Sequence, residues 1–244
     1  MLTRRLFCGC LPLVAGFAAT AGSALGAPAE PEGGACAVFS RERQRAETPA
    51  SALERLLQGH ERFLSGHTVN CDLRAQVKAT AGGQAPFAAI LGCMDSRVPV
   101  ELVFDQRIGD VFVARVAGNF VNTDILGSLE YATRVAGARL VMVLGHSGCG
   151  AIKGAIDDVH LGNLTATLAN IVPAVSATAT ADGPRSTANP HFVQAVAETN
   201  ARLATRELTR RSDVMRDLVK AGELRIVTAM HDVATGRVSL LADA

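Results

Sequence analysis

The chain has 244 residues, and its 24 lysines and arginines are interspersed with 23 aspartates and glutamates, which leaves a formal net charge of +1. This balance excludes a strongly basic or acidic surface field, so we expect neither nucleic acid nor a membrane as a partner. The length fits a single α/β domain with a sizeable core, and no internal repeat is evident.

Residues 1–29 have the features of an export signal. Paired Arg4 and Arg5 precede an uncharged, alanine-rich apolar stretch over residues 11–25, and Ala27-Pro28-Ala29 offers a cleavage site. The apolar stretch is too short to favour a membrane-spanning helix. Because the paired arginines are typical of the twin-arginine route, which carries folded proteins, we expect a periplasmic or secreted protein.

Residues 30–47, rich in proline, glycine and charge, are expected to form a linker or an arm before the main domain, residues 48–244. A helix begins at Thr48-Pro49, with proline in its first turn. Its apolar face is formed by residues spaced three or four apart, namely Leu53, Leu56, Leu57, His60, Phe63 and Leu64. We interpret His60 as a core or subunit-interface histidine, in preference to a ligand or proton shuttle.

Strands and helices alternate along the rest of the chain. Apolar runs predict strands at Phe87–Leu91, Val111–Val116, Leu140–Leu144, Leu224–Met230 and Arg237–Leu241. Helices are predicted at Asp124–Val135 with Asp124 as the cap, Ala151–Asp158, Phe192–Thr209 and Asp213–Ala221, with a short amphipathic element at Val100–Asp105. The segment Thr165–Pro190 is expected to be partly loop. The alternation predicts an α/β fold, a mostly parallel sheet flanked by helices, with a helical N-terminal arm.

Two of the predicted strands lead directly into turns that carry metal-ligand side chains. Cys93 follows the strand at Phe87–Leu91, and His146 and Cys149 follow the strand at Leu140–Leu144. The carboxyl ends of neighbouring parallel strands meet at one edge of a sheet, where ligands bind. Two cysteines and one histidine suit Zn²⁺, and a fourth position left open is typical of a catalytic zinc site. We therefore expect one zinc ion per chain.

Asp95 and Arg97 come directly after Cys93. The carboxylate could ligate the metal as a fourth ligand in a closed site, accept a hydrogen bond from the metal's water, or pair with Arg97. A bidentate hold by Arg97 would keep Asp95 off the metal. The simpler alternative is a turn with a surface ion pair, which the flanking Cys93 makes the less favoured interpretation.

These motifs together resemble the β-class carbonic anhydrases. The resemblance is carried by Cys-x-Asp-Ser-Arg-Val, Gly109–Arg115, Ala117–Asn119, Glu130–Ala132 and Gly-His-Ser-x-Cys-Gly, and it runs from about Ala52 to Leu241. It implies that residues 48–244 form a catalytic zinc domain that hydrates CO₂ reversibly to bicarbonate and a proton through zinc-bound hydroxide. It also implies a homodimer or a higher homo-oligomer.

The resemblance implies further site residues. Gln84 matches a glutamine that hydrogen-bonds substrate across the subunit interface, although a loop glutamine could also cap the strand start. Phe112 and Tyr131 match a substrate pocket built from two subunits, and Ala117 stands where plant-like members have valine; the two aromatics could equally be core residues. In the subgroup that bicarbonate inhibits, a tryptophan helps to form the inhibitory pocket. This chain has no tryptophan, which favours the open site.

Two alternative functions remain. One is a relative with the same zinc site that acts on another small cumulene such as CS₂. The other is a non-catalytic zinc or redox protein in which Cys93 and Cys149 form a disulfide. The presence of Asp95, Arg97 and Gln84 argues against the second, because a structural site would not need them.

Cys36 and Cys71 belong neither to the export signal nor to the predicted zinc site. In an oxidising compartment they could form a disulfide, or they could remain two free thiols. A bridge requires the arm to fold back along the helix that begins at Thr48-Pro49, either on its own subunit or on a partner.

Overall fold

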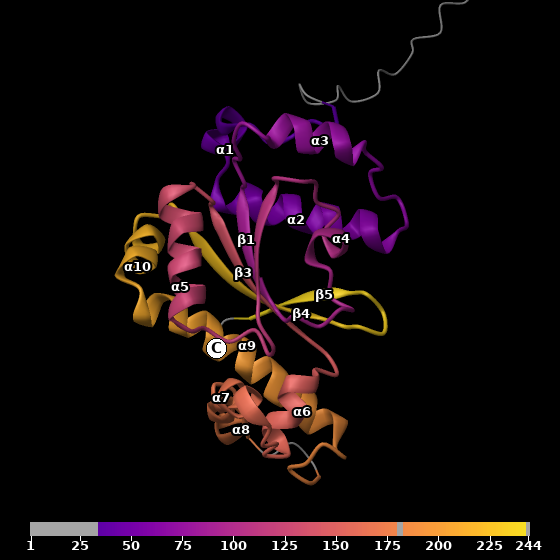
Figure 1. The fold of residues 1–244 in the computed structure, drawn as a ribbon, viewed down its shortest axis with the longest axis vertical. Coiled ribbons are helices and arrows are strands. Elements are labelled where there is room, and N and C mark those ends of the chain that lie inside the picture. The colour runs from indigo at the N-terminus through magenta and orange to yellow at the C-terminus, as the bar shows by residue number, and fades with distance from the viewer. Residues whose placement is uncertain (1–33, 180–182, 243–244) are drawn as a thin grey trace, which may run out of the picture. The chain divides into compact units, whose positions relative to one another are not determined.

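A five-stranded sheet forms the centre of the domain in the computed structural model, which describes residues 34–179 and 183–242 (Figure 1). The strands lie in the order β2-β1-β3-β4-β5 and span Val111–Arg115, Ala88–Gly92, Leu140–His146, Arg225–His231 and Val238–Leu241. The first four run parallel, and β5 runs antiparallel to β4. The predicted mostly parallel α/β sheet is therefore confirmed. The predicted export signal at 1–29 lies outside the described residues.

One face of the sheet is covered by α2 (Pro49–Leu64) and the short helix α4 (Val100–Val103). The helix α2 begins at Pro49 as the sequence predicts, and its first turn is capped by Thr48, whose side chain accepts a hydrogen bond from the Ser51 backbone N–H. His60 is buried on this face: its Nδ1 lies 3.1 Å from the Val103 carbonyl oxygen, and its Nε2 accepts from the Val238 backbone N–H at 2.9 Å. His60 is thus a satisfied core residue.

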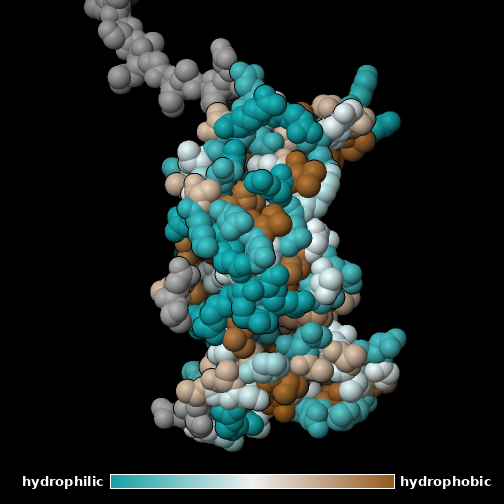
Figure 2. Space-filling view, turned by 90° about the vertical axis from the view of Figure 1, so that its left-hand side faces the viewer, coloured by the Kyte–Doolittle hydropathy of each residue, from teal (hydrophilic) through white to brown (hydrophobic). Residues whose placement is uncertain are grey.

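The other face is covered by α5 (Thr123–Glu130), α6 (Gly150–Ile156), α9 (Pro190–Arg211) and α10 (Asp213–Lys220). After α5 the chain continues as a π-helical turn, Tyr131–Val135. The cap of α5 is Asn122, whose Oδ1 accepts from the Ile125 backbone N–H at 2.8 Å, so the prediction that Asp124 caps this helix is wrong. Figure 2 shows the side of the molecule on which α5 and α10 lie as mainly hydrophilic with scattered hydrophobic residues, as expected for helices whose apolar sides face inward.

Three helices among the described residues are not predicted from the sequence. They are α3 (Leu73–Thr80), α7 (Gly162–Ala169) and α8 (Val172–Ala177), the last two within and around the segment expected to be partly loop. Proline lies in the first turn of α8, where its missing N–H costs nothing. α3 begins at Asp72, whose carboxylate accepts from two backbone amides of the first turn. Both signals are local and short, so no apolar periodicity over several turns indicates these helices.

The N-terminal arm is folded against the domain. It contains helix α1 (Arg41–Ala46), whose buried Gln44 donates to the carbonyl oxygens of Pro86 at 2.6 Å and Ala136 at 2.8 Å. Cys36 and Cys71 form a disulfide with a Cα–Cα distance of 5.5 Å, which confirms the bridged alternative. Within the described ranges, no helix is both long and apolar enough to span a bilayer.

Candidate metal centre

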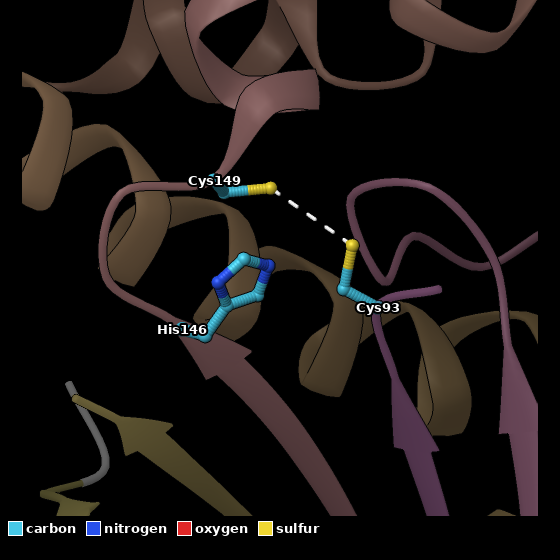
Figure 3. Close-up of side chains that lie close together, drawn as sticks. All are labelled: Cys93, His146 and Cys149. Atoms are coloured by element: carbon cyan, nitrogen blue, oxygen red, sulfur yellow. Dashed lines mark hydrogen bonds between the residues drawn. The ribbon is translucent and has the colours of Figure 1, made fainter. Parts of the chain in front are cut away.

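Two neighbouring strands bring the three predicted metal ligands together. Cys93 follows β1, His146 is the last residue of β3, and Cys149 lies at the start of α6. In the parallel pair β1 and β3, Gly92 is level with Leu144, so both strands end at the same edge. Figure 3 shows the three side chains converging there. Their ligand atoms all lie within 4.8 Å of one another, and the two sulfurs are 4.0 Å apart.

The chemistry of this cluster fits a zinc ion. The Nδ1 of His146 lies 3.0 Å from the Ser147 carbonyl oxygen, which can only accept, so this nitrogen carries the ring proton. The other nitrogen, Nε2, is buried and has no hydrogen-bond partner among the described residues. An unpartnered imidazole lone pair beside two buried sulfurs matches the ligands of tetrahedral zinc sites that leave one position open.

The two cysteines share one negative charge in the metal-free protein. A hydrogen bond from Cys149 lowers the pKa of Cys93 to about 4, against the opposing effect of burial, and the Gly118 backbone N–H also favours the thiolate. The same hydrogen bond to Cys93, together with burial, raises the pKa of Cys149. A second thiolate would therefore need a cation between the sulfurs, as a divalent metal ion provides.

Asp95 is held at the rim of the cluster by Arg97. The guanidinium donates from Nε to Oδ1 at 2.9 Å and from Nη2 to Oδ2 at 2.8 Å, and the Arg97 backbone N–H also donates to Oδ1. These hydrogen bonds keep the pKa of the Asp95 carboxyl well below its usual range. Asp95 Oδ2 lies 3.9 Å from His146 Nε2. An ionised carboxylate thus lies next to the ligand nitrogen while both of its oxygens are engaged by Arg97.

Arg115, which was not predicted as a site residue, holds the turn after Cys93 through hydrogen bonds to its backbone. From the end of β2 its Nε donates to the Cys93 carbonyl oxygen at 2.8 Å and its Nη2 to the Asp95 carbonyl oxygen at 2.6 Å. These bonds fix the backbone that carries both side chains. The motif Gly109–Arg115 contains this residue, but a motif alone does not show what a side chain contacts.

The predicted substrate-pocket residues do not gather around the metal ligands within one chain. Phe112 and Tyr131 are in edge-to-face contact, with ring centroids 6.2 Å apart, and line a cavity of about 620 Å³ between β2 and α5. Phe112 is paired with Ala89 across the β1–β2 ladder, and Ala89 precedes Cys93 by four residues. Phe112 and Cys93 are therefore separated by roughly 13 Å along the strand direction. Tyr131 is 52% exposed.

Gln84 and Ala117 lie at opposite ends of the sheet. Gln84 is exposed and precedes β1, so it lies at the end of the strand away from Cys93. Ala117 directly precedes Gly118, whose backbone N–H donates to the Cys93 sulfur at 3.3 Å. Of the predicted pocket residues, Ala117 is therefore the one next to the metal centre of its own chain.

A family model described as carbonic anhydrase matches residues 88–238, which include all three predicted ligands. This chain belongs to the β-class carbonic anhydrase family. The carbonic anhydrase of Mycolicibacterium smegmatis is 33% identical over 198 residues, covering 79% of this chain and 93% of the relative. Carbonic anhydrase 2 of Mycobacterium tuberculosis is 43% identical over 117 residues, which are 48% of this chain and 56% of the relative. The chain thus spans about half the length of this second relative.

Solved structures of β-carbonic anhydrases share the fold. The enzyme from Coccomyxa, in complex with acetazolamide, superimposes with a TM-score of 0.62 at 23% identity, covering 78% of this chain and 86% of that one. Crystal structures are known for two tetrameric β-carbonic anhydrases from Sordaria macrospora. A chain from these structures superimposes with a TM-score of 0.59 at 25% identity, covering 79% of this chain and 95% of that one. The resemblance inferred from the motifs is confirmed at the level of family and fold.

Proposed function

We propose that this β-carbonic anhydrase family member is a zinc enzyme that catalyses the reversible hydration of CO₂ to bicarbonate and a proton. The observation that carries the proposal is the buried cluster of Cys93, His146 and Cys149, with an unpartnered ligand nitrogen and an ionised carboxylate beside it. Family membership supports the same activity.

Each site residue has a separate role in this proposal. Cys93, His146 and Cys149 would hold one zinc ion, which would supply a Lewis acid that acidifies water. Asp95 stays ionised and accepts a hydrogen bond from the attacking water, which orients that water toward the carbon of CO₂. Arg97 engages both oxygens of Asp95, which would keep the carboxylate from binding the zinc ion.

We propose that substrate binding needs a second copy of the chain. Gln84, Phe112 and Tyr131 lie away from the metal ligands of their own chain, and Tyr131 is half exposed beside the edge strand β2. In a homodimer these side chains serve the site of the other subunit, while Ala117 lines the site of its own chain. CO₂ is small and apolar, so an aromatic pocket suits it. The tetrameric relatives from Sordaria macrospora support an oligomer.

We propose that the protein works in the periplasm or outside the cell. The support comes from the paired Arg4 and Arg5 in the sequence and from the Cys36–Cys71 disulfide, a bond that persists mainly in oxidising compartments. Export in the folded state would also protect the site, because zinc bound before export keeps Cys93 and Cys149 from being oxidised to a disulfide.

The decisive experiment measures zinc content and CO₂ hydration on the same preparation of the chain from residue 30 onward. We expect about one zinc per chain, and loss of both metal and activity in Cys149→Ser. Cys71→Ser is the matched control, because it removes a cysteine that is not a ligand and should retain zinc and activity. A metal-free preparation with full activity would refute the proposal, and turnover of CS₂ without CO₂ hydration would replace it with the cumulene alternative.

A further inference from the structure

A buried asparagine of α9 reaches the metal centre through one glycine. Asn200 is 3% exposed, and its Nδ2 donates to the Gly118 carbonyl oxygen at 2.7 Å. The backbone N–H of the same glycine donates to the sulfur of Cys93 at 3.3 Å. Gly118 therefore links a side chain 82 residues further along the chain to a ligand atom of the predicted zinc site.

The backbone around Gly118 is held in a conformation that few residues adopt. Gly118 has a φ of +82° and Asn119 a φ of +41°, and a Cβ on Gly118 would lie 2.4 Å from Cδ1 of Ile171. The peptide group after Gly118 is anchored at both ends. Its carbonyl oxygen accepts from Asn200, and its N–H, that of Asn119, donates to the Val116 carbonyl oxygen at 3.0 Å. With that peptide fixed, the preceding N–H stays directed at Cys93.

A hydrogen bond to a ligating thiolate changes the Lewis acidity of the metal that the thiolate binds. The N–H draws electron density from the sulfur, so the thiolate becomes a weaker donor and the metal a stronger Lewis acid. Two thiolates and a neutral imidazole cancel the formal charge of a zinc ion, which weakens its ability to acidify water. In such a site, a hydrogen bond that partly offsets the donation from one sulfur favours catalysis at lower pH.

We propose that Asn200 is a positioning residue of the metal centre: it holds the Gly118 segment so that the Gly118 N–H bonds to the Cys93 sulfur, and it thereby maintains the Lewis acidity of the metal. The effect on activity rests on the proposed function. The hydrogen bond to the sulfur does not, so the two can be tested separately.

The first test uses the unaltered protein loaded with ¹¹³Cd. Nuclear magnetic resonance correlation between amide protons and cadmium detects a proton whose hydrogen bond ends on a ligating sulfur. We expect a cross-peak between the Gly118 amide proton and the metal. A spectrum in which cadmium couples to the cysteine Hβ protons but not to the Gly118 amide would overturn the proposal without reference to activity or to any variant.

The second test compares Asn200→Asp and Asn200→Ala with Thr205→Val. Asn200→Asp keeps the size of the side chain but turns a carboxylate oxygen toward the Gly118 carbonyl oxygen, and Asn200→Ala leaves that oxygen without its donor. Thr205 lies on the same helix, and its Oγ1 is 2.8 Å from Oγ1 of Thr228 on β4. Thr205→Val therefore removes a polar contact between α9 and the sheet that does not lead to a ligand.

We expect both Asn200 variants to lose the Gly118 cross-peak and to shift the sulfur-to-metal charge-transfer band of the Co²⁺ form to longer wavelength. The pH profile of kcat/KM should move to higher pH, with a loss of about tenfold at neutral pH. Thr205→Val should match the unaltered protein in all three. Asn200 variants that melt at lower temperature but keep the cobalt band and the pH profile would reduce Asn200 to a structural residue. Band shifts in a protein that never hydrates CO₂ would instead refute the proposed function and leave the positioning role standing.

Discussion

The guanidinium of Arg97 engages both carboxylate oxygens of Asp95, with Nε–Oδ1 at 2.9 Å and Nη2–Oδ2 at 2.8 Å, while Oδ2 lies 3.9 Å from His146 Nε2. In the proposed mechanism, this contact would leave the carboxylate free to orient water and would keep it off the metal. Because Arg97 is largely exposed, its contribution to the stability of the fold is small. We therefore expect a change at Arg97 to alter the catalytic rate more than the stability of the fold.

Arg97→Ala and Asp95→Asn should each reduce kcat/KM by about 100-fold or more, the first by freeing Asp95 to take the fourth position and the second by removing the acceptor. Stopped-flow CO₂ hydration gives the rates, and a crystal structure of the zinc-loaded Arg97→Ala variant should show the Asp95 carboxylate at the fourth position in place of water. Arg210→Ala is the control, since Arg210 makes a similar ion pair with Glu207 away from the site. An Arg97→Ala enzyme of normal rate would contradict the assigned role.

The metal-free protein should contain one thiolate per pair of ligand cysteines at neutral pH. The lowered pKa of Cys93, about 4, means that this thiol is ionised above that pH, whereas the raised pKa of Cys149 keeps the second thiol protonated. Ultraviolet absorbance of the thiolate should therefore be present at pH 7 and disappear as the pH falls through about 4.

The same shift has a consequence for stability. A folded-state pKa below that of the unfolded chain stabilises the fold above the unfolded pKa, and this contribution is lost as the pH falls through the folded value.

Cys93→Ser should abolish the thiolate absorbance at neutral pH. An unaltered metal-free protein that shows no thiolate absorbance from about pH 5, one unit above the lowered pKa, to about pH 8, just below the usual thiol pKa, would contradict this assignment.

The Cys36–Cys71 bridge should be present in the exported protein. Counting thiols on zinc-stripped, denatured protein without reductant should find the two ligand cysteines only. Four reactive thiols would contradict the bridge. Because the bridge closes a loop with a sequence separation of 35 residues, Cys71→Ser should lower the free energy of unfolding by roughly 3–4 kcal/mol. The variant should retain its metal ligands.

Export should depend on the paired arginines. Replacing Arg4 and Arg5 together with lysine should leave uncleaved precursor in the cytoplasm, because the twin-arginine route recognises arginine at these positions. Fractionation followed by immunoblotting measures the distribution. Normal export of the variant would assign the protein to the general secretory route and would leave its destination unchanged.

The metal ligands and the sheet could be predicted from the sequence because both are encoded locally. The apolar runs before Cys93 and His146 predict buried strands, and in parallel neighbours the residues that follow must share one edge of the sheet. The spacing from His146 to Cys149 spans a single turn. The Asp95–Arg97 pair is likewise an interaction between residues two apart. Such features need only the strand period and the direction of the chain.

The contacts that surround this core depend on the packing of distant elements. Arg115 reaches two carbonyl oxygens of the neighbouring strand's turn, and Asn200 reaches Gly118 only because α9 packs across the strand ends. Arg115 belongs to the motif Gly109–Arg115, but the motif does not show what its side chain contacts, and no local pattern distinguishes Asn200 from any other asparagine. The separation of Phe112 and Tyr131 from Cys93 also depends on strand register, which is a property of paired strands and cannot be read from either strand alone.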